Sequence, residues 1–410
     1  MARDIIVQKY GGTSVADVSR IQNVARRVVK ARRGGKDVVV VVSALGDTTD
    51  NLIELALTIT NDPAERELDM LISTGEQVSC ALLAMAIHEL GEDAISFTGA
   101  QVGIITDNAF TRARIIDINA RRIEEELRKK RIVIVAGFQG VNVNQDITTL
   151  GRGGSNLTAV ALAKVLKARA CEMNTDVEGV FTADPRIVKD ARKIDKISYE
   201  EMFELASLGA QVLQPRSIEF AMKFAVPIHV RSSFSNRQGT IISREVRAME
   251  DIVVSGVAMN KDEAKVTICD VPDKPGIAAK IFREIARQGI NVDMIVQNVS
   301  RTGATDVSFT VLAGDLGKTI KVAKGISSKI GAGEITFDKD IAKVSIVGIG
   351  MKSHSGVAAN MFEALADNGI NIEMISTSEI KISAVVDKKR GQDAVRAIHA
   401  KFGLGKKRKS

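Results

Sequence analysis

The last third of the chain repeats itself, and this repeat constrains the fold more than any other feature. The repeated segments are AKVTI (264–268) and AKVSI (342–346), PGIAAKIF (275–282) and SGVAANMF (355–362), and GINVDMI (289–295) and GINIEMI (369–375). Each copy has the pattern of a strand, a loop, an amphipathic helix and a second strand, which predicts two small α+β modules of one kind. Because each module is too small to be very stable alone, we expect the two to pair.

One glycine in each copy, Gly276 or Gly356, falls where the first strand gives way to the helix. Backbone N–H groups at the start of a helix bind anions such as carboxylates. A glycine at this point also serves simply to make a tight turn. The pattern alone leaves both interpretations open.

The first part of the chain alternates short apolar runs with longer amphipathic stretches. The apolar runs predict strands at 4–8, 37–44, 131–138 and 227–234, and apolar residues at helical spacing predict helices at 19–33, 67–90 and 113–130. The second run, DVVVVVSA, is so continuously apolar that we expect both of its faces to be covered. This order predicts an α/β sandwich with a mostly parallel sheet, whose ligands bind at the carboxyl ends of the strands.

The composition is that of a globular protein and excludes several classes of function. The chain has 410 residues, of which 45% are hydrophobic and 26% charged, so we expect about two or three domains. Three cysteines and four histidines are scattered along it, which argues against a disulfide framework or a zinc site and favours a reducing, cytoplasmic location.

Membranes and nucleic acids are not expected partners. The amino-terminal residues lack the pattern of a signal peptide, and the apolar runs are shorter than the roughly 20 residues that span a bilayer. The net charge of +7 is modest, and part of it lies in the terminal GKKRKS. A solvated basic tail on a protein that handles anionic metabolites accounts for this charge better than nucleic-acid binding does.

Two motifs carry side chains suited to a charged substrate. In KYGGTSV (9–15), Lys9 ends the first predicted strand, and the following glycines admit close backbone approach, a combination that binds transferring phosphates. A surface lysine before a glycine turn is an equally good interpretation of this motif alone. In STGEQVS (73–79), Glu76 lies near a helix start, where it either accepts hydrogen bonds from an ammonium group or interacts with the helix dipole.

Two further motifs suit carboxylate and nucleotide groups. GRGGSN (151–156) offers Arg152 as a bidentate carboxylate partner, and it lacks the third glycine of the dinucleotide fingerprint, so NAD is not expected. TDVEGVFTADPR (175–186) places an acidic residue, an aromatic residue and Arg186 in one loop. Such a loop suits the ribose, base and phosphates of a nucleotide.

Taken together and in this order, the motifs resemble one family, the aspartate kinases, which phosphorylate the side-chain carboxylate of aspartate. The likeness runs through KYGGTSV, SALGDTTDNL, STGEQVS, VAGFQGV, GRGGS, TDVEGVFTADPR, ELASLGAQVLQPRS and RSSF, and both repeats look like ACT modules. The resemblance implies an amino-acid-kinase-type α/β sandwich followed by two ferredoxin-like ACT modules. The implied boundaries are 1–245 for the catalytic domain, 246–335 for the first module and 336–410 for the second.

The resemblance also assigns roles to residues. It implies a catalytic group of Lys9, Asn156 and Gln211. The nucleotide residues would be Lys9, Tyr10, Gly11, Gly12, Thr175, Asp176, Phe181, Arg186, Gln211 and Val212. The aspartate residues would be Thr49, Glu76, Arg152 and Ser155. The allosteric residues would be Asp273, Lys274, Pro275, Gly276, Asn291, Gln297 and Asn371.

The resemblance further implies cofactors and partners. The cofactor is ATP with magnesium, and because the sequence shows no metal-binding cluster, we expect phosphates and water to hold the ion. The expected effector is lysine or threonine, and we expect a homo-oligomer formed through the ACT modules.

Four residues depart from the family pattern in or beside the chemistry. The family usually has GRGGSD and GAKVLHPR, whereas this chain has Asn156, Gln211 and Gln214, and Asn174 replaces a usual tyrosine. Neutral residues, Asn156 and Gln211, therefore replace the family's acidic residue and its second lysine. Losing a charge-assisted contact costs about 2–4 kcal/mol of transition-state stabilisation.

Three hypotheses follow from these departures. The first is an aspartate kinase, with full or reduced turnover, that opens lysine, threonine and methionine biosynthesis. The second is a non-catalytic paralogue that acts as a regulatory partner or amino-acid sensor. The third is that the same site phosphorylates another carboxylate or transfers to a different acceptor.

Overall fold

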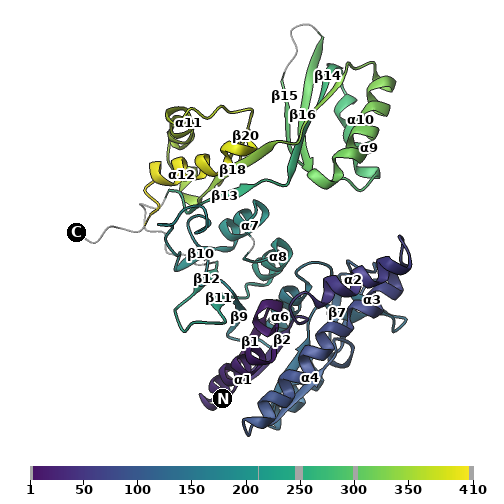
Figure 1. The fold of residues 1–410 in the computed structure, drawn as a ribbon, viewed down its shortest axis with the longest axis vertical. Coiled ribbons are helices and arrows are strands. Elements are labelled where there is room, and N and C mark those ends of the chain that lie inside the picture. Colours follow the sequence, from purple (N-terminus) through teal and green to yellow (C-terminus); the bar gives the residue numbers. More distant parts are fainter. Residues whose placement is uncertain (1–2, 211, 245–252, 299–302, 406–410) are drawn as a thin grey trace, which may run out of the picture. The chain divides into compact units, whose positions relative to one another are not determined.

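The computed structural model describes residues 3–210, 212–244, 253–298 and 303–405. The chain divides into two compact units (Figure 1). The first comprises Met1–Val180, Lys193–Ser207 and Gln211–Arg247, and the second comprises Phe181–Arg192, Leu208–Ala210 and Ala248–Ser410.

The first unit is built on a sheet that has eight strands over the described residues, in the order β10-β12-β11-β9-β1-β2-β6-β3. Its strands are β1 (Ile5–Tyr10), β2 (Asp37–Val42), β3 (Ala94–Phe97), β6 (Ile132–Ala136), β9 (Ala170–Thr175), β10 (Lys196–Ser198), β11 (Ile228–Ser232) and β12 (Thr240–Ser243). Neighbouring strands are parallel except β11 and β12. All six residues of β2 are buried, as its unbroken valine run predicts.

Helices cover both faces of this sheet. Side chains of α1 (Val18–Arg33) and α4 (Thr74–Glu89) form one core with Ile6, Val38 and Val40. Because side chains alternate along a strand, Val7, Val39 and Val41 point to the opposite face, and α6 (Gly154–Val165) packs against β1, β2 and β9. The expected parallel α/β sandwich is confirmed. The remaining helices of this unit are α2 (Thr48–Ile59), α3 (Glu65–Ile72), α5 (Arg121–Arg128), α7 (Tyr199–Ser207) and α8 (Pro215–Phe224).

A second, smaller sheet in this unit was not expected from the sequence. It has the order β5-β4-β7-β8, with β4 (Ile104–Thr106), β5 (Ile115–Ile118), β7 (Gln139–Val141) and β8 (Ile147–Thr149). The helix predicted over 113–130 is therefore wrong in its first part, since only Arg121–Arg128 is helical. The β-branched run at 115–118 finds a pairing partner in β4, and this pairing overrides the helical spacing.

One stretch, Glu65–Glu89, is long and apolar enough to cross a membrane by length and composition alone. The sequence predicted a helix over 67–90 in this stretch but did not single it out as a membrane candidate. In the structure it forms α3 and α4, and half of its most apolar window is buried inside the protein. Leu83 and Ile87 pack into the core beneath α1, so packing inside the unit accounts for its apolar composition.

The second unit contains two four-stranded sheets, each with two helices, as the repeat predicts. The first module has the order β15-β16-β14-β17, with β14 (Glu263–Pro272), α9 (Ile277–Arg287), β15 (Val292–Gln297), β16 (Ala304–Leu312), α10 (Leu316–Ile330) and β17 (Ile335–Asp338). The second has the order β13-β18-β20-β19, with β13 (Gly256–Asn260), β18 (Ile341–Val347), α11 (Val357–Asp367), β19 (Met374–Thr377), β20 (Lys381–Asp387) and α12 (Gly391–Lys401).

The first module is inserted into the second. Strand β13 precedes the first module in the chain, but it pairs antiparallel with β18 and completes the second module's sheet. The expected boundary between 335 and 336 instead assigns β13 to the first module. The repeat could not show this, because β13 has no counterpart in the matched segments.

The two modules pack against each other through equivalent parts of the repeat. Met294 and Met374, which occupy the same repeat position, lie in one buried cluster with Ile341 and Val385. The predicted pairing of the modules is confirmed within this unit.

Candidate functional site

The carboxyl ends of neighbouring parallel strands bring the KYGGTSV and TDV motifs together. Tyr10 at the end of β1 is aligned with Val42 of β2 and with Asn174 of β9. The loops that follow these strands therefore emerge at one edge of the sheet, the edge at which parallel α/β sheets bind ligands. They carry the glycines after Lys9 and the start of the TDV motif.

Lys9 is held close to the glycine turn that follows it. Its side chain is half-buried, and a Cβ atom placed on Gly11 would lie 3.2 Å from Lys9 Nζ. Burial lowers the pKa of Lys9 to about 8, although the nearby charges of Asp176 and Glu76 act to raise it. The ammonium group is thus mostly charged near pH 7 but poorly solvated, which favours an anionic ligand.

Glu76 is a buried carboxylate with an unused acceptor. Its side chain, in the first turn of α4, is 3% exposed, and Oε1 accepts a hydrogen bond from the backbone N–H of Ala44 at 3.2 Å. Within the described residues, Oε2 is buried without a hydrogen-bond partner. Burial raises the pKa of Glu76 to about 8. An unsatisfied buried oxygen is costly, so this carboxylate suits a cationic ligand.

The GRGGSN loop leads into α6. Gly153 has φ +74°, a conformation that side chains rarely adopt, and a Cβ atom there would meet Gln214 Cγ at 2.1 Å. Ser155 and Asn156 are buried in the first turn of the helix, and the backbone N–H of Asn156 donates to the carbonyl of Gly153 at 3.0 Å. Arg152 remains exposed at the mouth of the loop.

Other predicted residues lie nearby with different exposures. Thr49 is half-buried in the first turn of α2. The Tyr10 side chain is fully buried in the core beneath α1, so only its backbone is available to a ligand. Val212 is half-buried, and Gln211 lies outside the described residues.

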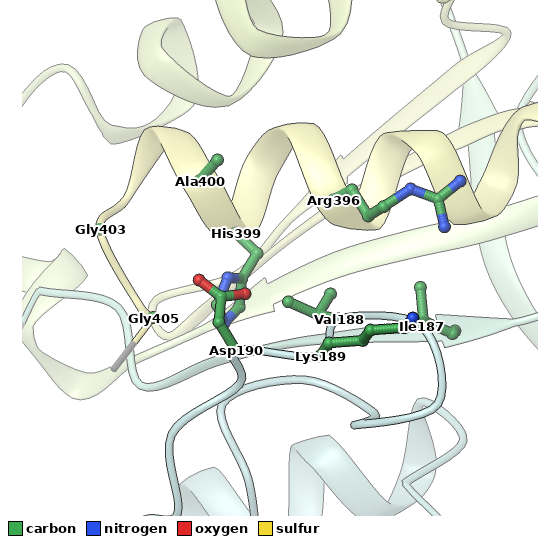
Figure 2. A pocket seen from close by; sticks show the side chains of 9 residues that line it. All are labelled: Ile187, Val188, Lys189, Asp190, Arg396, His399, Ala400, Gly403 and Gly405. Atoms are coloured by element: carbon green, nitrogen blue, oxygen red, sulfur yellow. The ribbon is translucent and has the colours of Figure 1, made fainter. Parts of the chain in front are cut away.

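The second unit contains a cavity that none of the predicted residues lines (Figure 2). It has a volume of about 690 Å³ and lies between segment 187–190 and the end of α12. Buried His399 on its wall is 3.0 Å from Thr182, from Nε2 to Oγ1. The polar side chains at its wall are of mixed charge, namely Lys189, Asp190 and Arg396 beside His399.

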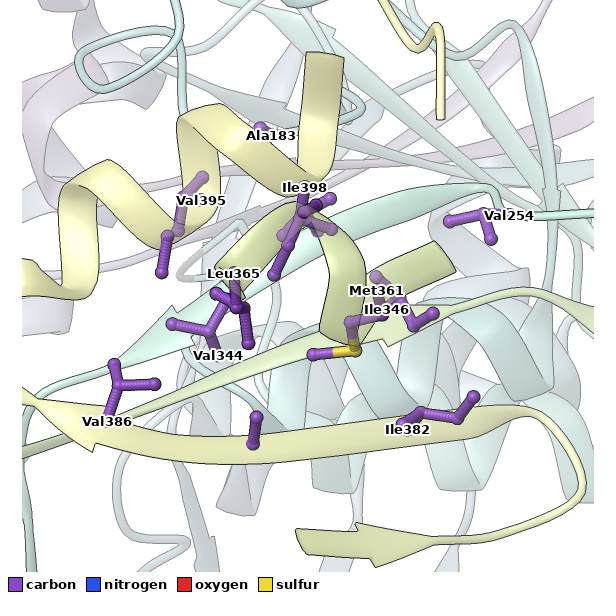
Figure 3. Packing of buried hydrophobic residues seen from close by; sticks show 14 of the residues in the cluster. Ala183, Val254, Val344, Ile346, Met361, Leu365, Ile382, Val386, Val395 and Ile398 are labelled. Atoms are coloured by element: carbon purple, nitrogen blue, oxygen red, sulfur yellow. The ribbon is translucent and has the colours of Figure 1, made fainter. Parts of the chain in front are cut away.

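The TDV motif is divided between the two units. Thr175 and Asp176 belong to the first, where Thr175 Oγ1 donates to Asp176 Oδ1 at 3.0 Å. Phe181 belongs to the second and packs against the hydrophobic core that contains Ala183 and Ile398 (Figure 3). Arg186 also belongs to the second, where its Nη2 lies 2.7 Å from Asp184 Oδ2. The structure does not bring these four residues together within one unit.

Six of the seven predicted allosteric residues lie in the first ACT-like module. Gly276, with φ +90°, caps α9, and the neighbouring Asp273, Lys274 and Pro275 are exposed. Asn291 and Gln297 flank or end β15 and are also exposed. Asn371 is in the second module, at the repeat position that corresponds to Asn291.

Sequence reasoning missed two contributors to this region. The backbone N–H of Ala44 holds Glu76, and a backbone donor leaves no signal in side-chain identity. Asp69 is fully buried beside the strand that leads into GRGGSN. An acidic residue inside an otherwise apolar helical face was the available signal for Asp69.

Comparison with known proteins identifies the family. Residues 4–232 match the model of the amino acid kinase family, and residues 265–326 and 344–402 each match an ACT domain. The chain is 54% identical over 401 residues to the aspartate kinase of Stutzerimonas stutzeri, which covers 98% of this chain and 97% of that protein. The chain belongs to the aspartate kinase family. The resemblance drawn from its motifs is confirmed.

Solved structures of aspartate kinases agree with the observed fold. Aspartokinase III of E. coli in complex with aspartate and ADP, in the R state, has a TM-score of 0.82 and 26% identity, covering 97% of this chain and 99% of that chain. The same enzyme in complex with lysine and aspartate, in the T state, has a TM-score of 0.76 with the same coverage and identity.

Proposed function

We propose that this chain transfers the terminal phosphoryl group of ATP to the side-chain carboxylate of aspartate, forming 4-phosphoaspartate. This reaction is the first step of lysine, threonine and methionine biosynthesis. The observation that carries the proposal is the buried, unpartnered Oε2 of Glu76 in the neighbourhood of Lys9. It offers a recess for the ammonium group of an amino acid, whose charge favours the ionised form of Glu76, beside a lysine suited to phosphate.

The aspartate site needs one partner for each charge of the substrate. Glu76 receives the ammonium group, and Arg152 receives the α-carboxylate through two parallel hydrogen bonds. Thr49 and Ser155 add hydroxyl groups. With both ends of the amino acid held, the side-chain carboxylate is directed toward Lys9 and the nucleotide, which is the orientation that reduces the entropic barrier to phosphoryl transfer.

The nucleotide site combines Lys9 with the backbone of Gly11 and Gly12. N–H groups of a glycine turn approach phosphate oxygens closely, and the ammonium of Lys9 stabilises charge that develops during transfer. We assign the remaining nucleotide contacts to Tyr10, Thr175, Asp176, Phe181, Arg186, Gln211 and Val212.

Magnesium would be held mainly by the substrate. Among the described residues, no group of three or more His, Cys, Asp or Glu side chains is arranged to hold a metal ion. An ion that is coordinated mainly by ATP phosphates and water needs no such group of side chains. The ion neutralises phosphate charge, so that the anionic carboxylate of aspartate approaches the phosphoryl group.

Regulation is assigned to the ACT modules. We propose that lysine or threonine binds at the exposed turn before α9, where its carboxylate meets backbone N–H groups. We assign further contacts with this effector to Asn291, Gln297 and Asn371. Lysine is present in one structure of the E. coli relative. The protein is proposed to act in the cytoplasm as a homo-oligomer assembled through these modules. One of the two amino acids should raise the melting temperature. If neither shifts it at millimolar concentration, this assignment is removed.

Acceptor selectivity tests the proposed reaction. With ATP and magnesium, ADP formation should depend on aspartate and should be far slower with succinate, which lacks the ammonium group that Glu76 is proposed to bind. Equal rates with succinate would show that Glu76 does not recognise an ammonium group. Faster reaction with another carboxylate would favour a changed acceptor.

A further inference from the structure

Asp69 in α3 is a fully buried carboxylate whose hydrogen bonds all converge on one strand end and one loop. Its Oδ1 accepts from Thr149 Oγ1 at 2.6 Å, and its Oδ2 accepts from the backbone N–H groups of Thr149 at 2.8 Å and Thr111 at 2.9 Å. All three donors are neutral. Burying a carboxylate without a counter-ion is expensive, whereas an apolar residue at this position would be compatible with a stable core.

The strand end that Asp69 holds leads directly into the GRGGSN loop. Thr149 is the last residue of β8, and only Leu150 lies between it and Gly151, the first residue of the loop. Arg152, whose guanidinium group is proposed to bind aspartate, is therefore only three positions beyond the anchored Thr149. A small shift at Thr149 displaces Arg152, and misplacement of a binding group by about 1 Å reduces catalysis by roughly a hundredfold.

Arg216 in α8 fixes Leu150, the residue between Thr149 and the loop. Arg216 Nη1 donates to the carbonyl of Leu150 at 2.6 Å, and its Nη2 donates to the carbonyl of Ala113 at 2.7 Å. The backbone N–H of Leu150 donates to the carbonyl of Phe138 at 2.8 Å. The chain is thus fixed at 149 and 150 by side chains from α3 and α8, immediately before it enters the loop.

We propose that Asp69 is a positioning residue for aspartate recognition, which acts by fixing Thr149 and thereby the Arg152 end of the GRGGSN loop. This proposal rests on the assignment of Arg152 to the substrate carboxylate. Asp69 itself does not touch substrate in this account. Its contribution is to keep the bidentate geometry of Arg152 in place before aspartate binds.

Two substitutions separate this role from a general loss of stability. Asp69→Asn replaces one acceptor oxygen by a donor, so at least one of the three hydrogen bonds is lost. Thr149→Val removes only the hydroxyl group and keeps the size of the side chain, while Thr149→Ser keeps the hydroxyl group. We expect Asp69→Asn and Thr149→Val to raise the KM for aspartate about tenfold or more, with the KM for ATP changed less than about twofold. Thr149→Ser should restore most of the wild-type value.

Asp37→Asn is the matched control. Asp37 is 6% exposed, but it lies at the amino end of β2, away from the carboxyl edge that carries the site, where it pairs with Arg3 and Arg32. This variant should lower the melting temperature without separating the two KM values. The proposal is overturned if Asp69→Asn changes the KM for aspartate and the KM for ATP by the same factor. It is also overturned if Thr149→Val is indistinguishable from the wild type. Should Asp69→Asn fail to fold, the comparison of Thr149→Val with Thr149→Ser decides.

Arg152→Lys, measured in parallel, distinguishes failure of this inference from failure of the proposed site. A raised aspartate KM for Arg152→Lys with unchanged values for Asp69→Asn and Thr149→Val rejects the positioning role alone. Unchanged values for all three variants reject the assignment of the GRGGSN loop to aspartate.

Discussion

The buried ammonium of Lys343 in β18 forms an ion pair with the carboxylate of Asp293 in β15, across the seam between the two ACT modules. The equivalent repeat positions form a second ion pair in which the modules have reversed roles. Here Lys265 of the first module pairs with Glu373 of the second module. The two pairs show that the modules are related by a pseudo-twofold arrangement. Lys343 is the more buried of the two lysines, and it also pairs with buried Glu263.

Removal of Lys343 should destabilise the second unit strongly. Lys343→Met leaves Glu263 as a buried charge without its cation, at a cost of about 3–5 kcal/mol. Lys265→Met is the control, because both members of its pair are 23% exposed, and we expect a loss of about 1 kcal/mol. Calorimetry of the full chain measures both. Equal effects would mean that burial does not decide the strength of these pairs.

Arg152→Lys should weaken aspartate binding by about ten- to a hundredfold, because lysine offers a point charge in place of the guanidinium fork. ATP binding should be nearly intact. Titration calorimetry with each ligand checks this, and Arg121→Lys on an exposed face of α5 serves as control. Unchanged aspartate affinity would make the GRGG turn purely structural.

Aspartate binding should release protons through Glu76. Its pKa is about 8 in the free protein, so at pH 7 most of it is protonated, and pairing with the substrate ammonium favours its charged form. Binding at pH 7 should therefore release close to one proton, and the release should vanish above about pH 9, where Glu76 is already ionised. Calorimetry in buffers with different ionisation enthalpies gives the number of protons. Glu76→Gln should abolish the release, and its persistence in that variant would assign the proton to another group.

The neutral residues Asn156 and Gln211 should act as a unit. Restoring one charge, by Asn156→Asp or Gln211→Lys, places an unpartnered charge in the site, whose desolvation offsets the gain. Restoring both should increase turnover more than additively. A double-mutant cycle at saturating ATP measures the coupling. If the gains merely add, or are absent in folded protein, the two substitutions do not limit this enzyme.

The sequence predicted those features of the fold that leave a periodic trace. The valine run of β2 and the repeat in the last third indicated the parallel sheet and the paired modules, and both are present. The membership of β13 in the second module's sheet depends on its long-range pairing with β18, which periodicity does not encode. The misassigned stretch at 115–118 shows the same limit, because its strand exists only through pairing with β4.

The candidate site was predictable to the extent that side-chain chemistry is visible in motifs. Lys9 and Glu76 lie near each other at the expected edge of the sheet, as their mutual effect on pKa values shows. The groups that hold these side chains in place were less visible in the sequence. Glu76 is held by the backbone N–H of Ala44, and Thr149 is held by Asp69, which is 80 residues away along the chain. Neither the described residues nor the relatives reported above favour a non-catalytic paralogue over an active kinase.

Trapping of the product tests the central claim most directly. Purified protein is incubated with ATP, magnesium and aspartate in the presence of hydroxylamine, which converts an acyl phosphate to a stable hydroxamate, and Lys9→Met is run alongside. The account predicts aspartyl hydroxamate in amounts that exceed the enzyme concentration, with the variant reduced by at least about a hundredfold. Binding of both ATP and aspartate to folded wild-type protein without hydroxamate would contradict it.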